Sequence, residues 1–259
     1  KIVIQMQRLL FASLEEDLGP LNDKEKQWAR ILNVTQLHRF TGRYAGPGTG
    51  RPRHSREKIA CAFVAKALYN FPTTDTLIES LKASPNLRRL CGWDHAYQVP
   101  SASTFSRAFQ AFAVDGLPAL AHEAVVADGL KDTLIGHVSR DATAVEGRER
   151  PTKKAPRAPR KNRRRGRPRK GEVREPEPPK RLAVQPTRTL EENLSDLPTA
   201  CDKGCKRNSQ GYEESWHGFK LHMDVVDGDI PVSAILTSAS VHDSQVAIPL
   251  AQTTASRVT

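Results

Sequence analysis

The sequence predicts an α+β protein, in which an all-helical N-terminal domain precedes a domain of strands and helices. Three observations support this prediction. Apolar residues recur at helical spacing through the first 130 residues, the period changes to two from residue 134, and a basic, proline-rich stretch interrupts the second region. We therefore place the domains at 1–130 and 134–259, with an insertion at 151–200 that should have no fixed structure.

Short helices account for most of the N-terminal region. Ser55 has the character of an N-cap for the first of them, and Pro85 ends the second and begins the third. The fourth carries Phe105, Phe109 and Phe112 on one face. The predicted helices cover 55–71, 73–84, the short piece that Gly92 stops, and 100–114.

The helix over 100–114 also carries Arg107, and short helices joined by brief turns ahead of it resemble a helix-turn-helix module. This pattern makes Arg107 a candidate for contacting DNA. An ordinary helical domain, in which the phenylalanine stripe is core, fits the same pattern equally well.

Residues 42–54 are basic and rich in Gly and Pro, which predicts an exposed loop.

Alternation predicts three strands in the second region. The first runs through 134–145 with Asp141 and Thr143 on one face, and the second, over 219–226, has a polar face of Lys220, His222 and Asp224. Asp227-Gly228 marks a tight hairpin. The following stretch, 230–240, is nearly all apolar and suits a sheet centre, and a helix with Pro249 in its first turn comes next. We expect the polar stretch 189–215 to be an irregular approach to the second strand.

The basic character of the chain is concentrated in one segment. Its formal net charge is +11, and residues 151–181 alone hold fourteen Lys and Arg against three Glu. Seven prolines and almost no apolar residues exclude a core there. A charge of this sign and density favours a polyanionic partner.

Within that segment, "RRRGRPRK" has the Arg-Gly-Arg-Pro form of an AT-hook, which lies along the narrow A·T minor groove. A solvated charge run is the simpler interpretation, and an A·T preference stays open. Lys220 is a further candidate for contacting DNA. The candidates in the segment are Arg163, Arg164, Arg165, Arg167, Arg169 and Lys170.

A zinc site is a weak alternative. Cys201, Cys205, His217 and His222 lie near zinc-finger spacing. However, both histidines fall on a predicted strand at an odd separation, so they project to opposite faces. The four cysteines are too scattered for a disulfide framework, which favours a reducing compartment. No stretch approaches the roughly 20 apolar residues of a membrane span, and the first residues do not resemble a secretory signal.

Asp141 needs an explanation, because a carboxylate on a strand between Ser139 and Thr143 is costly to bury. From the pattern alone it is either hydrogen-bonded at the end of the sheet or a metal ligand. Both interpretations stay open at this level.

Three stretches of the chain together resemble the DDE transposases of bacterial insertion sequences. They are "VPSASTFSR", "SRDATAVEGRERP" and "WHGFKLHMDVVDGDIPVSAILTSASVHDS". The resemblance runs from about residue 55 onward, and the combination is more specific than any single piece. It implies a helical N-terminal domain followed by a ribonuclease H-like domain, with Asp141, in its Asp-x-Thr setting, as the first catalytic acid.

The resemblance implies that Asp141 binds Mg²⁺ or Mn²⁺ for DNA cleavage and strand transfer. The second Asp and the Glu of that family are missing, so we expect a truncated transposase that binds DNA but is inactive alone. Asp243, in the "His-Asp-Ser" stretch, should bond backbone amides ahead of the last helix. We expect Asp224, Asp227 and Asp229 to be solvated turn acids.

The partner implied is double-stranded DNA at insertion-sequence ends, with no membrane and with a cytoplasmic, nucleoid-associated location in a bacterium. A homodimer on DNA is compatible with this reading. A non-catalytic DNA-binding protein derived from a transposase is the alternative. The second Asp and the Glu, if present downstream of Thr259, would separate the two.

Overall fold

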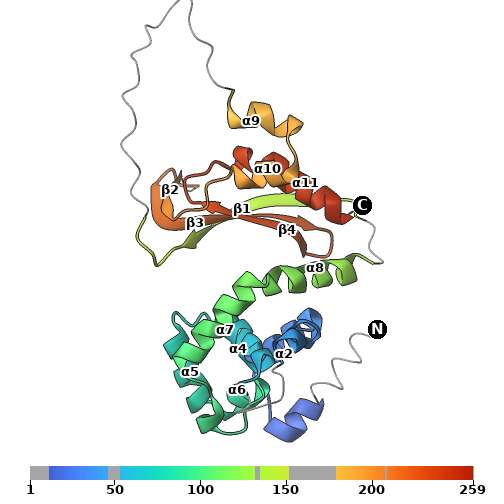
Figure 1. Ribbon diagram of the computed structural model, residues 1–259, viewed down its shortest axis with the longest axis vertical. Coiled ribbons are helices and arrows are strands. Elements are labelled where there is room, and N and C mark those ends of the chain that lie inside the picture. Colours follow the sequence, from blue (N-terminus) through green and yellow to red (C-terminus); the bar gives the residue numbers. More distant parts are fainter. Residues whose placement is uncertain (1–11, 46–52, 132–134, 152–178, 208, 259) are drawn as a thin grey trace, which may run out of the picture. The chain divides into compact units, whose positions relative to one another are not determined.

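The computed structural model describes residues 12–45, 53–131, 135–151, 179–207 and 209–258 (Figure 1). The chain divides into two compact units, Lys1–Asp128 and Gly129–Thr259. The N-terminal unit is helical, whereas the C-terminal unit is built on an antiparallel sheet, so the predicted mixture of helix and sheet is confirmed. No helix within these ranges is long and apolar enough to cross a membrane.

The helices predicted in the N-terminal unit form, and their ends follow local signals. The Ser55 side chain accepts a hydrogen bond from the Lys58 amide (3.3 Å), and Thr73 accepts one from the Thr76 amide (3.1 Å). Ser84 separates two helices and caps the second, whose first residue is Pro85. The predicted helices are α4 (Arg56–Leu68), α5 (Thr74–Ala83), α6 (Pro85–Leu90) and α7 (Ala102–Val114). The unit also contains α2 (Asp23–Thr35), α3 (His38–Thr41) and α8 (Leu117–Leu130), which were not predicted.

An aromatic cluster fills the core of this unit. Phe105 is fully buried, and its ring meets the ring of Phe63 edge-on at 5.7 Å between centroids. Phe112 is also buried and packs edge-on against Tyr44. Phe109 lies at the border of the cluster and is 60% exposed. Two of the three phenylalanines of the stripe are therefore core residues.

The sheet of the C-terminal unit is organised around one long strand, β3 (Glu213–Val226). Strand β1 (Val138–Glu146) pairs with one edge of β3, and β2 (Asp202–Arg207) and β4 (Ile230–Ser238) share the other edge, all antiparallel. Near the junction of β2 and β4, Gly218 has φ +150°, and a Cβ there would collide with the Val145 carbonyl oxygen and the Gly147 amide. This position therefore requires glycine.

Helices α10 (Leu190–Ser195) and α11 (Ala247–Val258) lie on one face of the sheet (Figure 1). Leu250 of α11 is buried there with Ile235, Val241 and Val246. Pro249 falls in the first turn of α11, as predicted. The hairpin after β3 is also confirmed, with Gly228 at φ +79°.

Two predictions for the polar stretches are wrong. We expected no fixed structure up to residue 200, but α9 (Arg181–Val184) and α10 form there, and α10 has a complete capping box from Thr189 and Glu192. We also expected an irregular chain over 189–215, where β2 and the first half of β3 pair instead. Residues 152–178, the larger part of the insertion, lie outside the described residues.

The apolar stretch 230–240 was predicted at the centre of the sheet, but the described residues place it at an edge, as β4. Over residues 135–151, 179–207 and 209–258, β4 pairs only with β3. Its residues Ser233, Ile235 and Thr237 are buried and alternate on one face, whereas Leu236 is 48% exposed. The burial of β4 therefore comes from the helices on one face and not from strands on both sides.

Candidate functional site

Asp141 lies in the middle of β1 and is exposed. It stands opposite Met223 of β3, so the two side chains share one face of the sheet. Its Oδ1 accepts a hydrogen bond from the Ala142 amide at 2.7 Å. The carboxylate is therefore carried by a regular strand and is accessible to a ligand.

The neighbouring residue, Arg140, points to the other face, where it hydrogen-bonds to Asp224 and to Ala247. Its Nε and Nη2 donate to Oδ1 and Oδ2 of Asp224, both at 2.7 Å, and its Nη1 donates to the Ala247 carbonyl at 2.9 Å. Asp224 is fully buried, which corrects the prediction of a solvated turn acid. Arg140 thus joins β1 to β3 and to the first turn of α11.

The network continues into α11. Thr254 Oγ1 donates to Asp224 Oδ2 and also lies within hydrogen-bond distance of Ser233 Oγ, both at 2.6 Å. Burial raises the pKa of the Asp224 carboxyl, but the hydrogen bonds from Arg140 and Thr254 outweigh it and hold the pKa below its usual value. The same pairing raises the pKa of Arg140. Asp224 is therefore favoured in its charged form although its side chain is buried from solvent.

Lys220 lies on the same face as Asp224, away from Asp141. Its Nζ donates to the Val241 carbonyl (3.0 Å) and to Asp243 Oδ1 (3.1 Å), and its side chain is 17% exposed. The structure therefore does not bring Lys220, a predicted DNA contact, together with Asp141. Asp243 pairs with this lysine, and the backbone-capping role predicted for it belongs to His242, which accepts from the Ser244 amide.

His222 is buried between these groups. One ring nitrogen, Nε2, lies 3.0 Å from Thr237 Oγ1, and Nδ1 lies 3.6 Å from Asp243. Burial lowers the pKa of His222, the Lys220 charge acts in the same direction, and Asp243 opposes them. His222 is therefore favoured in its neutral form.

The two acids of the hairpin differ from each other. Asp227 accepts hydrogen bonds from the Gly136 and His137 amides at 2.6 and 2.9 Å, and these bonds lower its pKa. Asp227 thus fixes the two residues that precede β1, whereas we predicted a solvated acid without such contacts. Asp229 is exposed within the turn, at φ +60°, as predicted.

Most of the residues predicted to contact DNA cannot be placed. Arg107 is exposed on α7, and its Nε donates to the Ser103 carbonyl at 3.2 Å. The rest of the set, Arg163, Arg164, Arg165, Arg167, Arg169 and Lys170, lies outside the described residues.

The described side chains offer Asp141 no grouped metal ligands. In the described ranges, no three His, Cys, Asp or Glu residues are grouped in a way that would hold a metal ion. Asp141 therefore has no set of partner ligands there, and this part of the chain does not by itself fit a two-metal site. Of the zinc candidates, Cys201 and His222 are buried, whereas Cys205 and His217 are exposed.

The sequence did not predict that Arg140 and Thr254 both hydrogen-bond to Asp224. One signal was present, because Lys220, His222 and Asp224 alternate on one face of a strand that a helix follows. A helix packed on that face buries the polar side chains and requires partners for them.

Comparison with known proteins finds a match for the N-terminal unit. Residues 14–111 match the family model described as "Transposase domain (DUF772)". The match spans α2 to most of α7 and supports a transposase family for the chain. No curated protein and no solved structure matches the sequence.

Proposed function

We propose that this chain is the DNA-binding portion and first catalytic strand of a DDE-type transposase. The observation that carries the proposal is the transposase-domain match over residues 14–111, followed along the chain by an exposed acid, Asp141, on a strand. The match concerns the helical unit, so the assignment of chemistry to the second unit is our inference from Asp141 and its setting.

The fold of the second unit supports this assignment. Strands β1, β3 and β4 run antiparallel in that order, and α11 follows. This is the order expected for the opening part of a ribonuclease H-like domain. The remaining acids would have to come from residues beyond the described ones or from another molecule.

If ligands from outside the described residues joined it, Asp141 would hold a divalent ion, Mg²⁺ or Mn²⁺, and that ion would supply Lewis-acid activation at a DNA phosphodiester. The contribution of this chain is to place the carboxylate. The Arg140–Asp224 pair fixes β1 against β3 one position away from Asp141, and Asp227 fixes the start of the strand. A carboxylate held in this way needs little rearrangement when its ligand binds.

DNA binding is assigned to the helical unit and to the basic segment. The segment 151–181 carries the whole formal net charge of the chain, and Lys and Arg that neutralise phosphates release counterions. We expect the ends of an insertion sequence to be the biological target, bound before any cleavage occurs.

The test separates binding from chemistry. The purified chain is titrated with fluorescent duplex DNA at several salt concentrations, with wild type and Asp141→Asn compared for binding and for Mg²⁺-dependent cleavage. We expect equal DNA affinity for the two proteins, because Asn keeps the size and hydrogen bonding of Asp. An absence of DNA binding by the wild-type chain would refute the proposal.

The catalytic role of Asp141 is tested in an active complex, in which the remaining acids are supplied. There, Asp141→Asn should reduce cleavage by several orders of magnitude, on the scale expected when a metal site is dismantled. Cleavage that survives the substitution would show that Asp141 is not a catalytic acid, which would favour a second function, a non-catalytic DNA-binding role for this region. The missing ligand partners of Asp141 in the described residues favour that alternative.

A further inference from the structure

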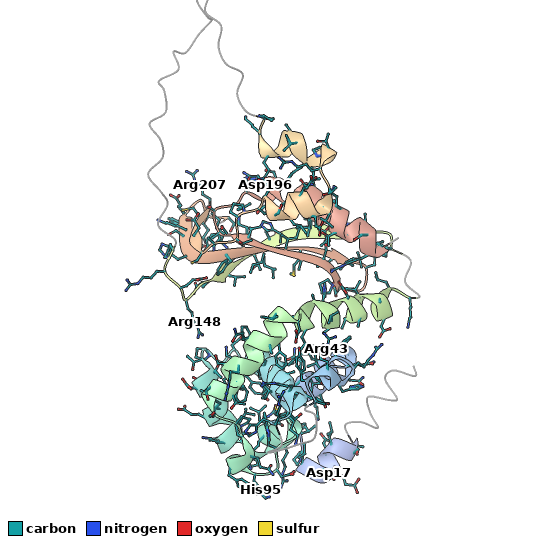
Figure 2. The ribbon with its side chains drawn as sticks, in the orientation of Figure 1. Asp17, Arg43, His95, Arg148, Asp196 and Arg207 are labelled. Atoms are coloured by element: carbon teal, nitrogen blue, oxygen red, sulfur yellow. The ribbon has the colours of Figure 1, made fainter. Side chains whose placement is uncertain are left out.

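An exposed aromatic pair lies in the helical unit between α6 and α7. The Tyr97 side chain is 82% exposed, and its ring stacks on the ring of His95 with centroids 5.2 Å apart and planes within 10°. Figure 2 shows His95 at the surface of this unit. Most of the Tyr97 ring is therefore accessible to a ligand.

The loop that carries the pair is fixed from within. Gln98 Oε1 accepts hydrogen bonds from the Asp94 and His95 amides at 2.9 and 3.1 Å. Trp93 and Val99, on either side of the loop, are buried. The two rings are therefore held outward by an ordered backbone, and little conformational entropy remains to be lost on binding.

Cations outnumber acids in the sequence around the loop. The Arg88 guanidinium donates to the carbonyls of Asp94, Leu81 and Lys82, at 3.4, 3.3 and 3.0 Å, so its contacts in the described part of the chain are to neutral groups. Arg89 is exposed nearby in the sequence. Residues 82–98 hold three cations and a single acid, Asp94, which favours an anionic partner.

From this arrangement we infer that the Tyr97–His95 pair is a stacking surface for an unpaired DNA base. Sites for single-stranded nucleic acid combine aromatic faces, on which bases stack, with cationic groups along the backbone. A fully paired duplex hides its base faces, whereas an unpaired end or an extruded base presents one. The inference rests on the proposed function and names the part of the DNA that the helical unit contacts.

The experiment compares two probes of the same mixed sequence, a fully paired duplex and a duplex with a short unpaired tail. Affinities are measured by fluorescence anisotropy at a fixed salt concentration. The proteins are the wild-type chain, Tyr97→Ala, Tyr97→Phe, and the control Tyr212→Ala. Tyr212 is 69% exposed and lies in the other unit, so its substitution removes a comparable ring elsewhere. Circular dichroism checks that each variant is folded.

We expect the wild-type chain to prefer the tailed probe. Tyr97→Ala should lose roughly 5- to 150-fold in affinity for that probe, since stacking contributes about 1–3 kcal/mol per base. Tyr97→Phe and Tyr212→Ala should keep wild-type affinity, and binding to the paired probe should be unchanged in all variants.

Three outcomes overturn the inference. In the first, the wild-type chain binds the two probes with equal affinity. In the second, Tyr97→Ala binds the tailed probe as tightly as Tyr212→Ala does. In the third, Tyr97→Ala loses the same affinity for both probes. In each case DNA binding by the wild-type chain still stands, so the proposed function survives. Failure of the wild-type chain to bind either probe refutes the proposed function itself.

Discussion

Arg140 and Asp224 face each other across the β1–β3 pair and are joined by two hydrogen bonds of 2.7 Å. The arginine side chain is 38% exposed and the aspartate is fully buried. The two residues are 84 positions apart in the sequence. Because Arg140 is adjacent to Asp141, this bidentate pair fixes the part of β1 that carries the candidate catalytic acid.

Substituting Arg140 by Met should destabilise the sheet by about 3 kcal/mol, because it leaves a buried carboxylate without its cation. Hydrogen exchange of β3 amides measures this loss locally, apart from the helical unit. Lys206→Met is the matched control. It breaks the exposed cross-strand pair with Glu214, whose ion-pair distance is 3.6 Å, and should cost at most about 1 kcal/mol. Equal effects of the two substitutions would contradict this interpretation.

Stability should fall as the pH decreases below 6.5. The pKa of buried His222 is lowered from 6.5 in the folded chain, so the unfolded chain binds more protons between the two values. This contribution is complete above pH 6.5 and is lost as the pH falls toward the folded-state pKa. Thermal denaturation of wild type and His222→Gln across this range checks it, since the variant should show a flatter profile.

A second acid-induced loss should occur at lower pH, through Asp224. Its pKa is lowered from 3.8, so its contribution is present above that value and disappears as the pH falls through the folded-state pKa. Measured below pH 4, the Arg140→Met protein should show less of this dependence than the wild type. An identical slope in the two proteins would mean that Arg140 does not hold the carboxylate ionised.

Deleting residues 152–178 should weaken duplex binding and flatten its salt dependence. The deleted stretch holds twelve Lys and Arg against three Glu, and each phosphate contact contributes about 0.9 to the slope of log affinity against log salt. The deletion stops before Lys180 and Arg181 because Arg181 bonds Asp196 at 2.6 Å. Anisotropy titrations over a salt series measure the slope, and an unchanged slope would assign DNA binding elsewhere.

Gly218→Ala should destabilise the sheet by at least about 2 kcal/mol, because its φ is unfavourable for alanine and its Cβ would meet backbone atoms of β1 and Gly147. Gly42→Ala is the control, since a Cβ at Gly42 has no neighbour within 4 Å and its backbone is helical. Chemical denaturation followed at β1 and β3 amides distinguishes the two. A Gly218→Ala protein as stable as the control would show that the strands adjust.

The helices were predictable because their signals are local. Ser55, Thr73 and Ser84 each precede the backbone amides that they cap, so a few adjacent residues suffice to place a helix start. The Thr189–Glu192 capping box was equally readable and was overlooked within a polar stretch. Local signals can therefore predict a short helix even within a polar stretch.

The role of Asp224 could not be predicted in the same way. An aspartate on the polar face of a strand is solvated or buried depending on what packs against it. Here the answer lies with Arg140 and with Thr254, which is 30 positions away. No pattern within the strand specifies those partners. The position of Asp141 on β1 follows from the alternation, but its catalytic role stays a prediction.

The long connection between β1 and β3 has an evolutionary consequence. The alignment of these strands is set by contacts such as the Arg140–Asp224 pair and by the requirement for Gly218, all of them outside the basic segment. Doubling the length of a connecting loop costs only about 0.6 kcal/mol. Insertions, deletions and charge changes within 152–178 are therefore nearly neutral for the sheet. Selection could therefore change the charge and length of this segment while the strand bearing Asp141 keeps its geometry.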